Sequence, residues 1–128
     1  MNGKRFILDT NAIISLLKGN LNLLNILEDA DWIGISVISK IEFRAFKGLS
    51  DADAMLFDTF LQRVDVVDLT NRNERLLQNT IKIRKQYKIK LPDAIIISTA
   101  ISNRSTLITA DKQLSLVKEV DILSFESF

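Results

Sequence analysis

The sequence predicts an α/β fold in which a mostly parallel sheet is covered by helices on both faces. Short apolar segments alternate along the chain with longer amphipathic ones, which is typical of strands that alternate with helices. The apolar segments are nearly continuous in hydrophobic residues, as expected for parallel strands that are buried on both sides. One helical segment, Pro92–Asn103, is apolar on almost every side, which predicts that it lies in the interior.

The predicted strands are short, and several end directly before a polar or acidic residue. They cover Arg5–Leu8, Trp32–Ser36, Val64–Leu69, Thr106–Thr109 and Asp121–Phe125. Ligands of parallel α/β sheets bind beyond the carboxyl ends of the strands. The residues that follow these strands are therefore the first candidates for a functional site.

The predicted helices have recognisable ends. Gly19 is expected to end the first helix, because glycine adopts the left-handed conformation that often follows a helix, and the third helix is expected to end at Gly48. Ser50 or Asp51 is expected to cap the fourth. In order, the helices are predicted over Thr10–Lys18, Leu21–Ala30, Ser39–Lys47, Asp51–Val64, Asn71–Tyr87 (with Leu76, Leu77, Ile81 and Ile83 facing inward) and Pro92–Asn103, followed by a helical turn over Asp111–Val117.

The composition restricts the chemistry more than the charge does. The chain has 128 residues, the size of a single domain over 1–128, and 17 basic and 16 acidic residues give it a net charge of +1. It contains no cysteine, which excludes disulfides and thiolate chemistry, and no histidine, the usual general base. Catalysis would therefore depend on carboxylates, hydroxyls, lysine or arginine. Without a membrane-length apolar run or a signal peptide, the expected location is the cytoplasm.

Acidic residues fall at the junctions between predicted strands and helices. Asp9 and Asp111 follow two strands, Glu42 lies in the helix after a third, and Asp93 begins the apolar helix. Taken singly, each has a structural explanation as a helix cap, a first-turn acid or a solvated helix residue. If these acids gather at one edge of the sheet, each close pair of carboxylates would repel by roughly several kcal/mol. A bound Mg²⁺ or Mn²⁺ would relieve that repulsion. Because such an ion activates water and stabilises charge on a phosphate, the pattern predicts a hydrolytic nuclease.

The segments around these acids resemble the PIN-domain ribonucleases, and more narrowly the VapC-type toxins of toxin–antitoxin systems. The matching segments occur in the family's order and span nearly the whole chain. They are FILDTNAII around Asp9, ISVISKIEF around Glu42, KLPDAIIISTAI around Asp93 and LITADKQL around Asp111. Each motif is short, and the combination of all of them makes the resemblance specific.

The resemblance implies a Rossmann-like, three-layer α/β/α sandwich and Mg²⁺-dependent endonucleolytic cleavage of RNA. It implies that Asp9, Asp93 and Asp111 bind the metal and that Glu42 completes the site. Asn11 and Thr109 match polar neighbours that orient the metal ligands in this family. The resemblance further implies a homodimer that a cognate antitoxin holds inactive.

Two further segments are candidates for binding surfaces. The stretch KIRKQYKIK is rich in cations and leads toward Asp93, so its basic side chains are expected to hold RNA phosphates while its tyrosine stacks on a base. An equally good explanation is a solvated helix end whose cations complement the helix dipole. The apolar segment LNLLNILEDADW is expected to belong mainly to the core, with an antitoxin groove as the alternative. The candidate RNA-binding residues are Lys82, Arg84, Lys85, Tyr87, Lys88 and Lys90.

Other function classes fit the sequence less well. A phosphatase or receiver domain would also place an aspartate at a strand end, but the phosphatase pattern requires a second aspartate where this chain has Asn11. Receiver domains carry paired acids after the first strand, where only Asp9 is present. A non-catalytic RNA- or partner-binding scaffold is a third alternative, but such a scaffold gains nothing from mutual repulsion among the acids.

Overall fold

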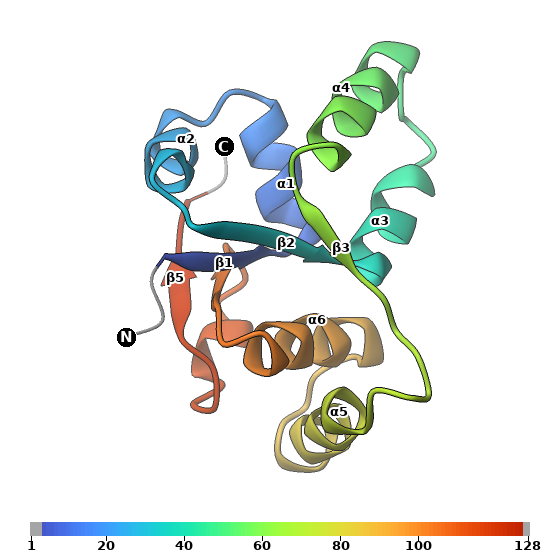
Figure 1. Cartoon of the computed structure of the whole chain (residues 1–128), viewed down its shortest axis with the longest axis vertical. Coiled ribbons are helices and arrows are strands. Elements are labelled where there is room, and N and C mark those ends of the chain that lie inside the picture. Colours follow the sequence, from blue (N-terminus) through green and yellow to red (C-terminus); the bar gives the residue numbers. More distant parts are fainter. Residues whose placement is uncertain (1–3, 127–128) are drawn as a thin grey trace.

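A computed structural model of the chain describes residues 4–126, and it contains a parallel sheet of five strands in the order β3-β2-β1-β4-β5 (Figure 1). The predicted α/β fold is therefore confirmed. Three strands have the predicted bounds, and the two edge strands are shorter than predicted. The strands are β1 (Arg5–Leu8), β2 (Trp32–Ser36), β3 (Asp65–Val67), β4 (Thr106–Thr109) and β5 (Ile122–Ser124).

Helices form a layer on each face of the sheet (Figure 1). One layer contains α1 (Thr10–Leu17), α2 (Leu21–Glu28) and α4 (Asp51–Leu61), and the other contains α5 (Glu74–Gln86) and α6 (Leu91–Ser102). The helix α3 (Val37–Arg44) directly follows β2 and contacts both α1 and α6. A short 3₁₀ helix, η1 (Leu114–Leu116), replaces the longer helical turn predicted after β4.

Side-chain caps explain where most helices begin. Ser36 accepts a hydrogen bond from the amide of Ile38, so α3 begins two residues earlier than predicted. The helix ends at Arg44, so the predicted end at Gly48 was wrong. Asn73 caps α5 in the same way, and the predicted start of that helix at Asn71 was too early. Gly19 has a φ angle of 90°, which confirms its predicted place after α1. Local hydrogen-bonding side chains thus shifted boundaries that the apolar pattern alone did not determine.

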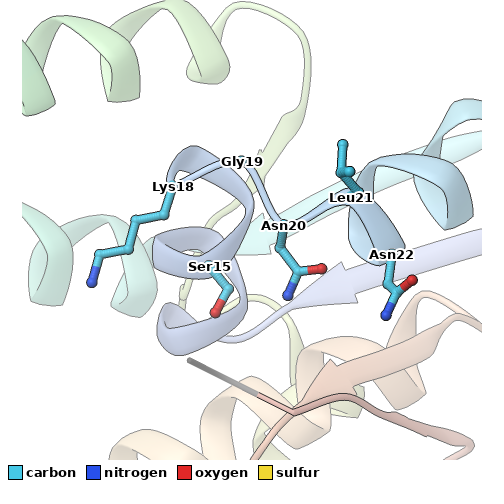
Figure 2. A pocket seen from close by; sticks show the side chains of 6 residues that line it. All are labelled: Ser15, Lys18, Gly19, Asn20, Leu21 and Asn22. Atoms are coloured by element: carbon cyan, nitrogen blue, oxygen red, sulfur yellow. The ribbon is translucent and has the colours of Figure 1, made fainter.

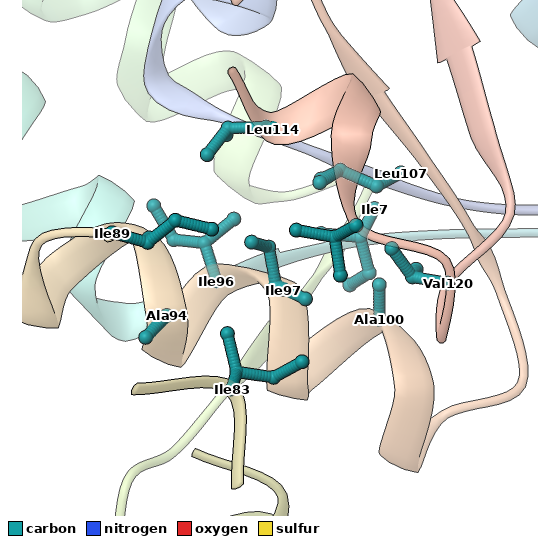
Figure 3. Close-up of a cluster of buried hydrophobic side chains, with 11 residues drawn as sticks. Ile7, Ile83, Ile89, Ala94, Ile96, Ile97, Ala100, Leu107, Leu114 and Val120 are labelled. Atoms are coloured by element: carbon teal, nitrogen blue, oxygen red, sulfur yellow. The ribbon is translucent and has the colours of Figure 1, made fainter. Parts of the chain in front are cut away.

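The hydrophobic core lies on both sides of the sheet. Figure 3 shows the cluster on the α6 side, where Ile7 and Leu107 of the sheet meet Ile96, Ile97 and other residues of α6. Every residue of α6 from Ala94 to Ala100 is buried, as the all-round apolar pattern predicted. On the opposite face, the second cluster contains a buried stack of Phe43 and Phe57, whose ring centroids are 4.0 Å apart.

Two of the inward-facing residues predicted for α5 do not lie in the core. Leu76 and Ile83 are buried as expected, but Ile81 is 45% exposed and that prediction was wrong. Leu77 is only partly buried. Thr80 occupies the core-facing position instead, because its hydroxyl donates to the carbonyl of Leu76 and so needs no outside partner.

The strand order places a switch point at the centre of the sheet. The chain proceeds from β1 to β2 and β3 on one side and then returns to place β4 and β5 on the other. In α/β sheets the crevice beyond the carboxyl ends at such a point is the usual ligand site. Here it lies beyond Leu8 of β1 and Thr109 of β4, which are neighbours in the sheet. Within residues 4–126, no helix is both long and apolar enough to cross a membrane.

Candidate active site

A pocket of about 200 Å³ lies beyond the carboxyl ends of β1 and β4, at the switch point. Its lining draws on α1, α3, α6 and the segment after β4, so residues far apart in the sequence meet there. All the acidic residues singled out in the sequence contribute, together with the predicted Asn11. The lining residues are Asp9, Thr10, Asn11, Glu42, Asp93, Ile96, Asp111 and Leu114.

Asp9 is the most buried of these acids, with 5% of its surface exposed. It is the N-cap of α1, since its Oδ1 accepts a hydrogen bond of 2.8 Å from the amide of Ala12. Its Oδ2 accepts a second one from the hydroxyl of Thr109. Burial, with a smaller contribution from the charges of Asp93 and Asp111, raises the pKa of Asp9 to about 6 despite these two bonds. The side chain is thus held in one place at an electrostatic cost.

Thr109 connects two of the acids through one hydroxyl group. It is fully buried at the end of β4, and besides donating to Asp9 it accepts a 3.0 Å hydrogen bond from the amide of Asp111. Asp111 in turn uses Oδ1 to accept a 2.9 Å bond from the amide of Gln113. The predicted orienting role of Thr109 therefore has a geometric basis, because the hydroxyl fixes the backbone and carboxylate on either side of it.

Asp93 lies in the first turn of α6, directly after Pro92, and is partly exposed. Desolvation raises its pKa, the charges of Asp111 and Glu42 raise it further, and Lys90 lowers it. Within residues 4–126, it is not held by any of the hydrogen bonds that fix Asp9 and Asp111. Asp93 is therefore free to turn toward a ligand in the pocket.

Glu42 lies on the exposed side of α3, and its Oε1 accepts a 2.6 Å hydrogen bond from the hydroxyl of Thr10. Sequence analysis singled out the glutamate but missed the threonine. Thr10 directly follows Asp9 and is the first residue of α1, but its contact with α3 leaves no signal in the sequence. The hydrophobic pocket residues Ile96 and Leu114 were also missed, because in sequence they are indistinguishable from the rest of the core.

The donor set of the pocket suits a hard divalent cation. Every acidic ligand offers carboxylate oxygen, and the chain has no histidine or cysteine to favour a softer metal. Among residues 4–126, no three acidic side chains are drawn close enough together to hold an ion as they stand. Burial is the main cause of the raised pKa values of Asp9 and Asp93, and repulsion from the neighbouring carboxylates adds to it. Lone pairs remain on each carboxylate, so a cation has ligands to recruit.

Three other depressions lack this chemistry. Figure 2 shows one of about 390 Å³ over the turn between α1 and α2, with Lys18 and two asparagines but no carboxylate. A second, of about 620 Å³, lies at the amino-terminal ends of β1 and β4 and mixes basic with acidic side chains. A third, of about 340 Å³, is mainly apolar and lies between α1, α3 and α4. The third is the neighbour of the acidic pocket, because Thr10 and Glu42 line both.

The charged side chains of the basic segment KIRKQYKIK, residues 82–90, are exposed, but two residues of this segment have structural roles. The guanidinium of Arg84 donates to the carbonyl of Ile89 over 2.7 Å. Tyr87 donates a 2.6 Å hydrogen bond to Glu119, which raises the pKa of the phenol, and its ring packs on the α6-side core. The lysines are exposed, and within residues 4–126 none of them forms an ion pair: Lys82, Lys85, Lys88 and Lys90.

The segment LNLLNILEDADW is divided between the core and the surface. Leu23 and Leu27 are buried against the sheet, as the preferred interpretation predicted. Leu21 and Leu24 are 71% and 45% exposed, so α2 also presents an apolar outer face.

Comparison with known proteins places this arrangement in context. The family model described as PIN domain matches residues 6–120. A search of curated proteins found no match. Among solved structures, a toxin–antitoxin complex from Klebsiella pneumoniae has 26% sequence identity and a TM-score of 0.73, covering 92% of this chain and 95% of that one.

Two further solved structures are similar in fold. VapBC-1 from nontypeable Haemophilus influenzae aligns with a TM-score of 0.77 and 22% identity, covering 94% of this chain and 97% of that one. DNA-bound VapBC from Salmonella typhimurium aligns with a TM-score of 0.73 and 22% identity, covering 94% and 98%. These alignments extend over almost the full length of each chain, so they confirm the three-layer architecture.

Proposed function

Because this chain belongs to the PIN-domain family, we propose that it is a divalent-metal-dependent endoribonuclease and the toxin of a toxin–antitoxin pair, acting in the cytoplasm as a single PIN domain. The observation that carries the proposal is the pocket at the switch point, where Asp9, Glu42, Asp93 and Asp111 meet from separate elements. The family match favours this activity over the phosphatase, receiver and scaffold alternatives.

Asp9, Asp93 and Asp111 would hold Mg²⁺ or Mn²⁺, and Glu42 would complete the site. When bound, the ion would activate water and stabilise the charge that develops on the scissile phosphate. The chain contributes a fixed ligand position, since the Thr109 hydroxyl and the Ala12 amide hold Asp9 before any ligand arrives. Asn11, which is exposed and lines the pocket, would orient a metal ligand or a substrate oxygen.

RNA binding would use the exposed lysines of the basic segment. Lys90 lies close enough to Asp93 to lower its pKa, so it connects the basic surface to the acidic pocket. Lys82, Lys85 and Lys88 extend this surface along and beyond the end of α5. Their contacts would be to phosphates, which gives affinity without base specificity. Arg84 and Tyr87 would support this surface chiefly through their bonds to Ile89 and Glu119, with base stacking by Tyr87 retained as a prediction.

The antitoxin would occupy the apolar pocket between α1, α3 and α4. Its lining includes Ile14, Leu17 and Phe46, and the Phe46 side chain is 65% exposed, so this surface is suited to an apolar helix of a partner. The similar structures from Klebsiella, Haemophilus and Salmonella are complexes of this toxin–antitoxin class, which supports the choice of occupant. We also propose that the toxin is a homodimer, to be measured by light scattering of the purified protein.

The function is tested by cleavage of single-stranded RNA with purified protein. Wild-type protein should cleave RNA in Mg²⁺ or Mn²⁺ and lose activity in EDTA. Asp9→Asn and Asp93→Asn should each lower the rate by at least about 100-fold, because each removes a metal ligand. Asp68→Asn, which removes the same charge from the exposed loop after β3, is the matched control. Unchanged cleavage by the Asp9 variant, or none by the wild type, would refute the proposal.

A further inference from the structure

The hydrogen bond between Thr10 and Glu42 connects two elements that are otherwise 32 residues apart in sequence. Thr10 is the first residue of α1 and directly follows Asp9, so its backbone position is fixed by the end of β1. Glu42 lies in the second turn of α3, which is packed in place through the buried Phe43. The bond therefore spans two well-anchored backbones, and only the glutamate side chain between them is free to move.

The length of this bond identifies a strong interaction. An O–H donor and a carboxylate separated by 2.6 Å are at the short distance typical of charge-assisted hydrogen bonds. An exposed glutamate on a helix otherwise samples several rotamers. Since Glu42 is exposed, the threonine hydroxyl is the contact that selects one orientation of its carboxylate.

That orientation directs the glutamate into the acidic pocket. Glu42 lines this pocket together with Asp93, so it lies near the first turn of α6. The pair also forms the wall between two pockets, because Thr10 and Glu42 line the acidic pocket and the apolar pocket alike. Without the bond, the glutamate would be free to turn toward the apolar side or toward solvent, away from Asp93.

We propose that Thr10 is a positioning residue, whose hydroxyl holds the Glu42 carboxylate over the acidic pocket so that it contributes to cation binding there. This inference rests on the proposed function and adds to it a residue that acts through Glu42 and does not itself touch the ion. A purely structural role for the hydroxyl is the competing explanation. It predicts lower stability in a Thr10 variant but no dependence on the glutamate.

The experiment measures Mn²⁺ affinity by electron paramagnetic resonance of the free ion, without any assay of cleavage. Thr10→Val removes the hydroxyl at nearly constant volume, and Thr10→Ser retains it. Thr59→Val is the matched control, since Thr59 is an exposed threonine on α4 whose hydroxyl bonds only to its own helix. Thr10→Val should weaken Mn²⁺ binding about tenfold, as expected for loss of a residue that orients a metal ligand. Thr10→Ser and Thr59→Val should bind within about twofold of the wild type.

A double-mutant cycle with Glu42→Ala separates positioning from structure. If Thr10 acts through the glutamate, Thr10→Val should have no further effect on Mn²⁺ affinity in the Glu42→Ala protein. The same tenfold loss in both backgrounds would overturn the inference, and so would wild-type affinity in Thr10→Val. In both of those cases the proposed function would still stand. Wild-type protein that binds no Mn²⁺ would overturn the proposed function and this inference together.

Discussion

Replacing Asp9 with asparagine should stabilise the metal-free protein at neutral pH. The folded state raises the pKa of this carboxyl from 3.8 to about 6, chiefly by burial. A raised carboxyl pKa means that the folded protein holds the proton more tightly than the unfolded chain does. The stability that the protonated Asp9 carboxyl contributes to the folded state is complete below pH 3.8 and is lost as the pH rises through 6. At about 1.4 kcal/mol per pKa unit, the loss amounts to roughly 3 kcal/mol by pH 7.

Asparagine removes this loss while retaining the local structure. Asparagine is as good an N-cap as aspartate, so the bond to the amide of Ala12 should persist. Thr109 can still bond to the side-chain amide. The variant should therefore gain about 2–3 kcal/mol over the wild type between pH 4 and pH 7, since it has no proton to release. This gain in stability should accompany the loss of cleavage, which separates the effect from misfolding.

The measurement is urea unfolding of both proteins in EDTA across that pH range. The quantity to compare is the difference in unfolding free energy between variant and wild type at each pH, because carboxylates that do not interact with Asp9 affect both proteins equally. Asp68→Asn is again the control and should show a constant difference. Parallel stability curves for Asp9→Asn and wild type would refute the burial argument. Mg²⁺ should restore stability to the wild type alone, since binding to the folded state is lost with the ligand.

Other predictions concern the framework of the fold. Arg104 has a φ angle of 51° after α6, so Arg104→Gly should stabilise the protein by about 0.5–1 kcal/mol in urea unfolding. Gly34 lies under the ring of Trp32, and a Cβ there would come within 2.3 Å of it; Gly34→Ala should therefore lower stability by about 1–3 kcal/mol and change the tryptophan fluorescence. Phe57 is fully buried against Phe43, so Phe57→Ala should cost about 3–5 kcal/mol, and a loss below 1 kcal/mol would contradict the observed packing.

The sequence predicted the framework well where the signal was local and strong. The strand Arg5–Leu8 was bounded correctly because its apolar run ended at Asp9. The interior position of α6 followed from its apolar residues on every side. The starts of α3 and α5 were less predictable, because a cap such as Ser36 or Asn73 competes with other polar residues nearby. Ile81 shows the remaining limit, since which helix face is buried depends on neighbours that the sequence does not reveal.

The candidate site was predictable in outline because parallel strands bring their carboxyl ends together. Placing Asp9 and Asp111 after strands was sufficient to expect them at one edge, whatever the strand order. Thr10 could not be identified in the same way. Its role depends on a contact with α3, and a threonine at the start of a helix has many structural explanations. The hydrogen bonds of Arg84 to Ile89 and of Tyr87 to Glu119 could not be predicted either, because they also depend on how the chain folds.

The structural and functional explanations of these acids, which the sequence presented as alternatives, apply together. Asp9 caps α1 and Asp111 caps the turn after β4, so each first bond fixes a carboxylate at the pocket. A capping bond uses one lone pair of an oxygen and leaves others for a cation. Capping alone, however, does not require burial, and a surface aspartate would cap α1 without a pKa near 6. A capping role therefore does not explain why Asp9 is buried at an electrostatic cost. A bound cation would remove that cost.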